Sequence, residues 1–133
     1  MREETAKKRI LVIDDDDRVL LSLEGLLESE GYETMTAWSG QEGLALLRSN
    51  AFDLVLLDDY LRDIEHEEIF GEIRAVANRP LIILTESSLM PEMRKYFMNL
   101  GAAAIVRKWD PREEIAEVVR NCFSTSALEP LAA

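Results

Sequence analysis

Acidic side chains follow two apolar runs of the sequence, at the point where each run ends. The run Ile10 to Ile13 is followed by four aspartates, and the run Leu54 to Leu57 is followed by Asp58 and Asp59. Like carboxylates about 5 Å apart repel each other by roughly 3 kcal/mol at an effective dielectric of about 20. Three or more together must therefore hold protons or bind a cation. Carboxylates with a backbone carbonyl and water suit Mg²⁺, and an aspartate on that ion can be a nucleophile toward phosphorus.

The runs that carry these acids have the pattern of buried parallel strands. Five apolar segments alternate with five segments of helical spacing, and continuous apolar runs are typical of strands covered on both faces. Right-handed crossovers with short connections predict an α/β fold, a (βα)5 doubly wound parallel sheet with strand order 2-1-3-4-5. That order makes the first and third strands neighbours, so Asp14 and Asp15 should lie beside Asp58. The predicted strands are 10–13, 33–38, 54–57, 81–84 and 103–106, and the predicted helices are 17–30, 67–76, 91–100 and two that begin after Ser39 and Asp110.

Length, charge and cysteine content limit the kind of protein this is. A chain of 133 residues with 47% hydrophobic content is enough for one core, and we expect one domain over 8–123 with flexible termini at 1–7 and 124–133. The net charge of −11 argues against nucleic acid or an anionic membrane as a direct partner and favours proteins. The single cysteine, Cys122, excludes an intramolecular disulfide, and no stretch has the length of a membrane span or the form of a signal peptide. We therefore expect a cytoplasmic location.

Two further polar residues follow predicted strands. Thr85 ends the fourth strand and Lys108 follows the fifth, so a hydroxyl group and an ammonium group should both face the acid cluster. Taken with the acid pair Asp14-Asp15, with Asp58 and with the step Gly101-Ala102, this ordered set resembles the response regulator receiver domain. The resemblance extends over roughly residues 8 to 123.

The resemblance implies a flavodoxin-like fold and a phosphoacceptor of a two-component phosphorelay, acting as a signalling switch and not as an enzyme. Asp58 would accept a phosphoryl group from a histidine kinase or phosphotransfer protein, and the signal would pass to a downstream protein target or to an effector domain absent from this chain. Lys108 would pair with an oxygen of Asp58 or of the phosphoryl group, and the Thr85 hydroxyl would bond the phosphoryl group. The implied ligands of Mg²⁺ are Asp14 through water, Asp15, Asp58 and the Tyr60 carbonyl.

The chain departs from the usual receiver pattern at five positions. In the loop after Asp58, Arg62 stands where proline is usual and His66 where glycine is usual, so we expect an altered loop. Glu86 follows Thr85 in place of a small residue, and we expect it to place an anion near the route to the phosphoryl site and to slow phosphorylation. Ile105 replaces the aromatic switch residue, so we expect that the usual threonine-to-aromatic coupling cannot operate unchanged. Trp109, which we expect to be partly buried, replaces the proline after the lysine.

Two other functions fit part of the pattern. The segment Ile10 to Asp17 also resembles the opening motif of haloacid dehalogenase-type phosphatases, in which two acids one residue apart serve as nucleophile and acid/base. The nucleophile would then be Asp14, but that family needs a further acidic pair late in the chain, and nothing after Lys108 supplies one. The second alternative is a binding module that keeps the receiver fold and signals without phosphorylation. An acetyl phosphate or beryllofluoride titration separates this alternative from the switch.

Overall fold

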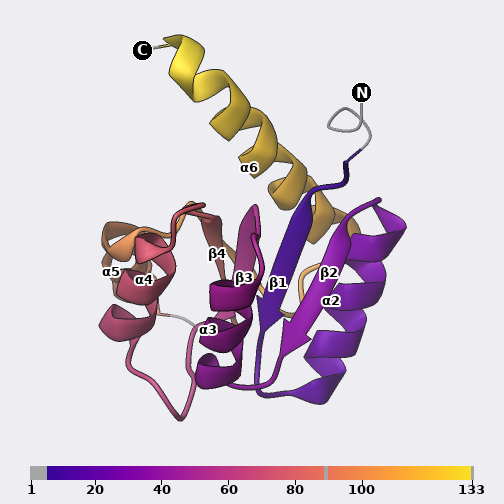
Figure 1. Cartoon of the computed structure of the whole chain (residues 1–133). Helices are drawn as coiled ribbons and strands as arrows, with labels where there is room; N and C mark the ends of the chain where they lie inside the picture. Colours follow the sequence, from indigo (N-terminus) through magenta and orange to yellow (C-terminus); the bar gives the residue numbers. More distant parts are fainter. Residues whose placement is uncertain (1–5, 89, 133) are drawn as a thin grey trace.

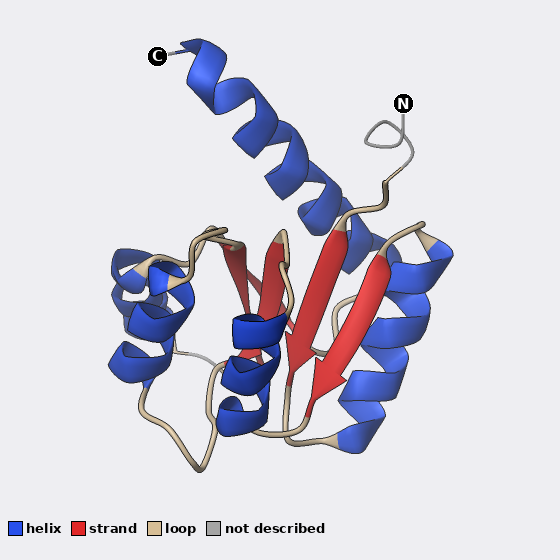
Figure 2. Cartoon of the chain, viewed as in Figure 1, coloured by secondary structure: helices blue, strands red, loops and turns tan. Residues whose placement is uncertain are grey.

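The computed structural model describes residues 6–88 and 90–132. Its five strands form one parallel sheet in the order β2-β1-β3-β4-β5, with helices on both faces (Figures 1 and 2). This order confirms the predicted α/β topology. The elements are β1 (Arg9–Ile13), α2 (Asp17–Ser29), β2 (Glu33–Ala37), α3 (Gly40–Ser49), β3 (Leu54–Asp58), α4 (His66–Ala75), β4 (Leu81–Glu86), α5 (Pro91–Leu100), β5 (Ala104–Arg107) and α6 (Arg112–Ala132).

Local signals in the sequence set several of these boundaries. The Ser39 side chain accepts a hydrogen bond from the Glu42 backbone N–H at 3.0 Å, and the Glu42 carboxylate accepts one from the Trp38 N–H at 2.8 Å, which fixes the start of α3. Helices α2 and α5 are each followed by a glycine with positive φ, Gly31 at 96° and Gly101 at 126°. The start of α3 and the ends of α2 and α5 are therefore set by local capping signals in the sequence.

Alternate side chains of each strand point to opposite faces of the sheet. Helices α3, α4 and α5 pack on one face and bury Leu11, Val55 and Leu84, whereas α2 and α6 pack on the other and bury Val12 and Leu56 with their neighbours. Figure 2 shows the resulting three layers of helix, sheet and helix. The same alternation decides to which face each polar residue at a strand end points.

One glycine lets a helix lie unusually close to the sheet. A Cβ atom on Gly43, in α3, would collide with the side chain of Ile13, the fully buried last residue of β1. Close-packed interiors cannot absorb such an overlap without movement of the neighbouring chain. Gly43 is therefore needed for the present distance between α3 and β1, and Ile13 directly precedes Asp14.

The last helix is longer than the sequence predicts. Residues 124–132, expected as part of a flexible terminus, belong to α6, which continues beyond the layer of the sheet (Figure 1). The expectation for residues 1–5 lies outside the described residues, and the domain boundary at 8–123 stays a prediction. Within the described ranges, no helix has the combination of length and apolar composition that a membrane span requires.

Candidate functional site

The strand ends bring four predicted site residues to one edge of the sheet. Asp58 and Thr85 are direct neighbours in the register of β3 and β4. Asp14 follows β1, and its backbone N–H donates to the Ala37 carbonyl at 3.1 Å, while the Lys108 N–H donates to the Glu86 carbonyl at 2.8 Å. These bonds continue the strand ladder past the last apolar residues. They fix the backbone from which each of the four side chains projects.

Three carboxylates meet a single ammonium group at this edge. Carboxylate oxygens of Asp14, Asp15 and Asp58 lie within 4.8 Å of one another. Lys108 Nζ lies 2.9 Å from Asp14 Oδ2 and 2.9 Å from Asp58 Oδ1. The structure thus brings together the acid pair, the candidate nucleophile and the lysine, which are far apart in sequence. Their chemical roles stay predictions at this point.

Burial strongly perturbs the ionisation of this cluster. Asp14 and Asp58 are 1% and 5% exposed, and burial raises the pKa of Asp58 to about 6. Burial also raises the pKa of Asp14, and the charge of Asp58 adds to this effect. Burial alone would lower the pKa of Lys108, but its close contacts with the Asp14 and Asp58 carboxylates outweigh this and raise it. The lysine therefore keeps its charge, and it cannot neutralise three carboxylates alone.

The donor set fits a hard divalent cation. Asp14 Oδ2 is buried and, although the Lys108 ammonium is close, has no aligned hydrogen bond within the described residues. Asp15 is exposed and lies at the mouth of the cluster, and the Tyr60 backbone N–H is 3.4 Å from Asp58 Oδ1, so the Tyr60 backbone lies at its rim. Carboxylate, carbonyl and water oxygens with open positions suit Mg²⁺. The residues present are compatible with the metal that the sequence predicts.

A second cluster of charged residues lies at the same edge of the sheet, on its opposite face. One residue beyond Asp58 and Thr85, alternation turns Asp59 and Glu86 toward the side of α3, α4 and α5. Arg107, the register partner of Glu86, places its Nε 3.5 Å from Glu86 Oε2. Burial raises the pKa of Asp59, with a further contribution from the Glu86 carboxylate.

The position of Glu86 corrects the expectation drawn from the sequence. The side chain is buried and lies on the face opposite Thr85, so it does not stand between solvent and Asp58. It borders a hollow of about 380 Å³ lined also by Ser87, Ser88, Arg107, Trp109 and Asp110. Trp109 is 69% exposed, not partly buried as expected, and the peptide after Lys108 is trans. Strand β4 continues one residue beyond Thr85, so strand alternation turns Glu86 to the other face.

The loop after Asp58 is anchored at both ends despite its unusual sequence. Asp63 accepts hydrogen bonds from the backbone N–H groups of Gly40 at 3.0 Å and Gln41 at 2.8 Å, which caps α3. His66 begins α4, and its ring lies edge-on against Phe97 of α5, with the ring centroids 4.8 Å apart. His66 thus packs against α5, and the expected difference from the usual receiver loop stays a prediction.

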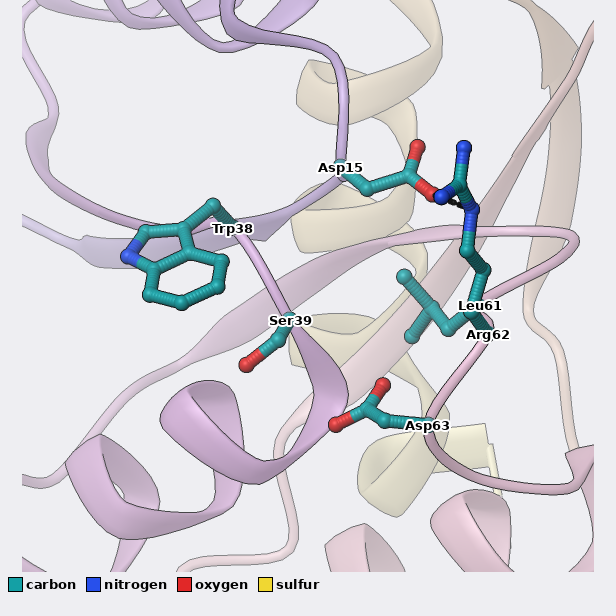
Figure 3. Close-up of a pocket in the computed structure, with 6 residues that line it drawn as sticks. All are labelled: Asp15, Trp38, Ser39, Leu61, Arg62 and Asp63. Carbon is teal, nitrogen blue, oxygen red and sulfur yellow. Dashed lines mark ion pairs between the residues drawn. The ribbon is translucent and has the colours of Figure 1, made fainter.

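A groove opens beside the acid cluster, between this loop and the start of α3 (Figure 3). We call it the Trp38 groove. Arg62 points toward Asp15, with Arg62 Nε 3.9 Å from Asp15 Oδ2. Nothing in the residue spacing indicates this contact, because it depends on the path of the loop. The groove has a volume of about 340 Å³ and is lined by Asp15, Trp38, Ser39, Leu61, Arg62 and Asp63.

Ile105 occupies the position at which the sequence predicts the loss of an aromatic switch. Its side chain is partly buried and packs against the core on the side of α3, α4 and α5. On that side, Tyr96 of α5 donates a hydrogen bond to Glu67 of α4 at 2.6 Å. That bond raises the pKa of Tyr96 to about 12, so the phenol stays protonated. The aromatic hydroxyl on this face therefore belongs to a contact between helices.

Comparison with known proteins gives a consistent result. The family model described as the response regulator receiver domain matches residues 10–120. The chain is 41% identical over 76 residues to the transcriptional regulatory protein AfsQ1 of Streptomyces coelicolor, covering 57% of this chain and 34% of that protein. It is 30% identical over 109 residues to SrrA of Staphylococcus aureus, covering 82% of this chain and 45% of that protein. The chain therefore spans less than half the length of these curated relatives.

Solved structures share the fold over nearly the whole chain. A CheY-like receiver domain protein from Methanospirillum hungatei has a TM-score of 0.85 at 30% identity, covering 93% of this chain and 99% of that one. The response regulator TrrA of Thermotoga maritima, solved in complex with Mg²⁺ and BeF, has a TM-score of 0.75 at 35% identity, covering 86% and 98%. The strand ends that carry the acid cluster lie within the family match at residues 10–120.

Proposed function

The chain belongs to the response regulator receiver domain family, and we propose that Asp58 is the residue through which it receives a phosphoryl group. One observation carries this assignment: Asp58 is buried, lies 2.9 Å from the Lys108 ammonium and shares a 4.8 Å cluster with Asp14 and Asp15. Asp14 is also buried and also lies 2.9 Å from Lys108 Nζ, but among the described acids only Asp58 is the register partner of Thr85 on the neighbouring strand. In this role the domain is a phosphorylation-dependent switch of a two-component system.

The reaction is the transfer of a phosphoryl group from a phosphohistidine to the Asp58 carboxylate. An Asp58 oxygen bonds to phosphorus while the P–N bond to the imidazole breaks, and the electron pair of that bond stays on the imidazole nitrogen. Both close nitrogen contacts of Asp58, from Lys108 Nζ and the Tyr60 N–H, fall on Oδ1. We therefore assign the attack to Oδ2, with Oδ1 held in place by these two donors.

The surrounding residues supply positive charge and hydrogen-bond donors for this step. Phosphoryl transfer depends mainly on positioning and on neutralising spread-out negative charge, which suits a buried ammonium and a strand-end hydroxyl. Lys108 would hold an oxygen of the phosphoryl group, and Thr85, the register partner of Asp58, would donate its hydroxyl hydrogen bond to another. When bound by Asp15, Asp58, the Tyr60 carbonyl and, through water, Asp14, Mg²⁺ would neutralise charge on the phosphoryl oxygens.

The wider assignments follow from the family. We place the domain at 8–123 and its location in the cytoplasm. It acts as a phosphoacceptor and not as an enzyme with its own substrate turnover. Its partners would be a histidine kinase or phosphotransfer protein on the input side and a protein target or effector domain on the output side. The relatives AfsQ1 and SrrA, described as transcriptional regulatory proteins, support an output of this kind.

The phosphatase alternative finds no support in the geometry. Its acid/base would be Asp16, but the Asp16 carboxylate accepts a hydrogen bond from the Arg18 backbone N–H at 2.9 Å and caps α2. The Asp14 carboxylate, its nucleophile, accepts a bond from the Asp16 N–H at 2.9 Å and contacts Lys108. The first acid is thus the partner of a lysine, and the second is a helix cap.

The test is whether the isolated chain takes up a phosphoryl group in a metal-dependent way. Incubation with acetyl phosphate and Mg²⁺, followed by mass spectrometry, should show one added phosphoryl group that is absent when EDTA replaces Mg²⁺. A titration with beryllofluoride and Mg²⁺, followed by amide chemical shifts, gives a second and non-covalent readout. A folded chain that responds to neither reagent would support the alternative of a binding module that signals without phosphorylation.

A further inference from the structure

Arg62 sits on a stretch of backbone that is held on both sides. Leu61 is buried on one side of it, and on the other side Ile64 is buried and Asp63 caps α3. Only Arg62 and Asp63 of this stretch are exposed, and Asp63 is occupied by the helix N–H groups. The loop therefore presents the guanidinium group at a defined place beside Asp15 (Figure 3).

The two cations at the site divide the three carboxylates between them. Lys108 contacts both buried acids, Asp14 and Asp58. Arg62 approaches that remaining acid from the solvent side, with its side chain 87% exposed and that of Asp15 38% exposed. Each of the three carboxylates thus has a cationic side chain within 4.0 Å.

We propose that Arg62 is an exchangeable counter-ion, which holds Asp15 in the metal-free protein and competes with Mg²⁺ for it. This inference rests on the proposed metal site. A divalent cation at the cluster would take an oxygen of Asp15, and Arg62 approaches Oδ2 of the same carboxylate, so two positive charges compete for one carboxylate. Binding of the metal must therefore weaken the contact between Arg62 and Asp15. The guanidinium group then stays in the Trp38 groove, where it can move without disturbing the anchored loop.

The expected size of the competition follows from the exposure of the pair. Ion pairs between exposed side chains are weak because both groups remain well hydrated and screened by salt. A single such pair shifts a binding constant by about two- to fivefold. Removal of Lys108 has no such simple expectation, since its contacts are buried. Arg62 is therefore a tuning residue, and its loss should strengthen the binding of Mg²⁺.

The experiment compares Mg²⁺ affinity in Arg62→Gln with that in wild type by calorimetric titration at low ionic strength. We expect about two- to fivefold tighter binding, with a difference that shrinks as NaCl is added. Arg48→Gln is the matched control, because it also removes one positive charge. Arg48 is likewise exposed and forms an ion pair at 3.9 Å, with Glu72. Arg48→Gln should change the affinity much less. Circular dichroism checks that each variant is folded.

A double-mutant cycle with Asp15→Asn separates the local pair from a general effect of charge. In the Asp15→Asn background, Arg62→Gln should no longer strengthen Mg²⁺ binding. Equal effects of Arg62→Gln and Arg48→Gln, or weaker binding in Arg62→Gln, would overturn the competition. Mg²⁺ binding that is insensitive to Asp15→Asn itself would overturn the proposed metal site as well, so the two failures are distinguishable.

Discussion

Two rows of charged and polar residues lie on opposite faces of the sheet at the carboxyl ends of its strands. The row that faces α2 and α6 contains Asp14, Asp58, Thr85 and Lys108, and the row that faces α3, α4 and α5 contains Asp59, Glu86 and Arg107. Both rows include buried or half-buried acids beside one base. In the first row, oxygens of Asp14, Asp58 and the neighbouring Asp15 lie within 4.8 Å of one another.

The comparison shows that two consecutive acids of one strand can differ in function, the first in a reactive site and the second in a structural contact. Asp58 and Asp59 are consecutive, and burial raises the pKa of both. The first meets an almost fully buried ammonium, whereas the base of the second row is Arg107, whose side chain is 74% exposed. A perturbed pKa therefore marks both acids, and the neighbours decide which of them can react.

The largest expected effect is a complete loss of phosphorylation when Asp58 is substituted, and not when Asp59 is. Asp58→Asn should abolish labelling by acetyl phosphate in Mg²⁺, because the amide is not a nucleophile toward phosphorus. Asp59→Asn should remain labelled on Asp58, since alternation points residue 59 to the other face. Mass spectrometry of the intact chain and of its peptides locates the label. Labelling that persists in Asp58→Asn would overturn the site assignment.

Removal of the base should also slow phosphorylation much more in the first row than in the second, although less completely than the loss of Asp58. Lys108→Ala should slow labelling by about a hundredfold or more, because it removes a preorganised charge at the reacting oxygen. Arg107→Ala should change the rate by only about two- to threefold, since its exposed guanidinium lies on the other face. Initial rates with acetyl phosphate measure both. Comparable losses in the two variants would mean that the second row takes part in the transfer.

The ionisation of Asp58 should make the metal-free protein less stable as the pH rises. Its folded-state pKa of about 6 is above its ordinary value of 3.8, so its contribution is fully present below pH 3.8 and is lost as the pH rises through about 6. The loss is at most about 3 kcal/mol, from about two pKa units. Urea unfolding from pH 4 to 7 in EDTA should show this slope in wild type relative to Asp58→Asn.

The same ionisation links Mg²⁺ to pH. Protons compete with the metal for Asp58, so Mg²⁺ affinity should fall as the pH is lowered through about 6. Saturating Mg²⁺ should also remove the destabilisation seen at neutral pH, since the metal neutralises the cluster. Calorimetry at pH 5 and 7 checks the first statement. A wild-type stability profile parallel to that of Asp58→Asn would contradict the assigned ionisation.

The smallest effect concerns the lifetime of the phosphorylated state. Tyr60, two residues beyond Asp58, has a bulky ring at the rim, and a bulky phenol excludes water from the reacting centre better than a small polar side chain. Tyr60→Asn should therefore accelerate loss of the phosphoryl group by a few fold, as followed by mass spectrometry over time. The ring is 63% exposed, which keeps the expected change modest. Equal decay rates would remove the shielding role and leave Asp58 as the acceptor.

Most of the first row could be predicted from the sequence, and the reasons are local. Apolar runs that end in acids locate Asp14, Asp15 and Asp58 at strand ends, and the strand order places them together. Thr85 and Lys108 follow from the same register. Their assembly depends on the backbone ladder, which periodicity reveals well.

The second row and the contact between Arg62 and Asp15 could not be predicted from the sequence. The face of Glu86 depends on whether β4 includes one residue after Thr85, and sequence patterns do not set strand ends that finely. The contact of Arg62 with Asp15 depends on Asp63 bonding the N–H groups of α3, a pairing across 22 and 23 residues. The exposure of Trp109 likewise follows from the path of a loop.

The absent side chain of Gly43 has a consequence for how this domain tolerates inherited change. Gly43 touches no charged group of the first row, yet a methyl group there would press on Ile13, the residue before Asp14. A saturation scan scored by signalling output should therefore record Gly43 as intolerant even to alanine, alongside the charged residues themselves. Among inherited variants, a substitution at position 43 would cause the same loss of signalling as a substitution of an acid in the site. Its cause would be the changed distance between α3 and β1.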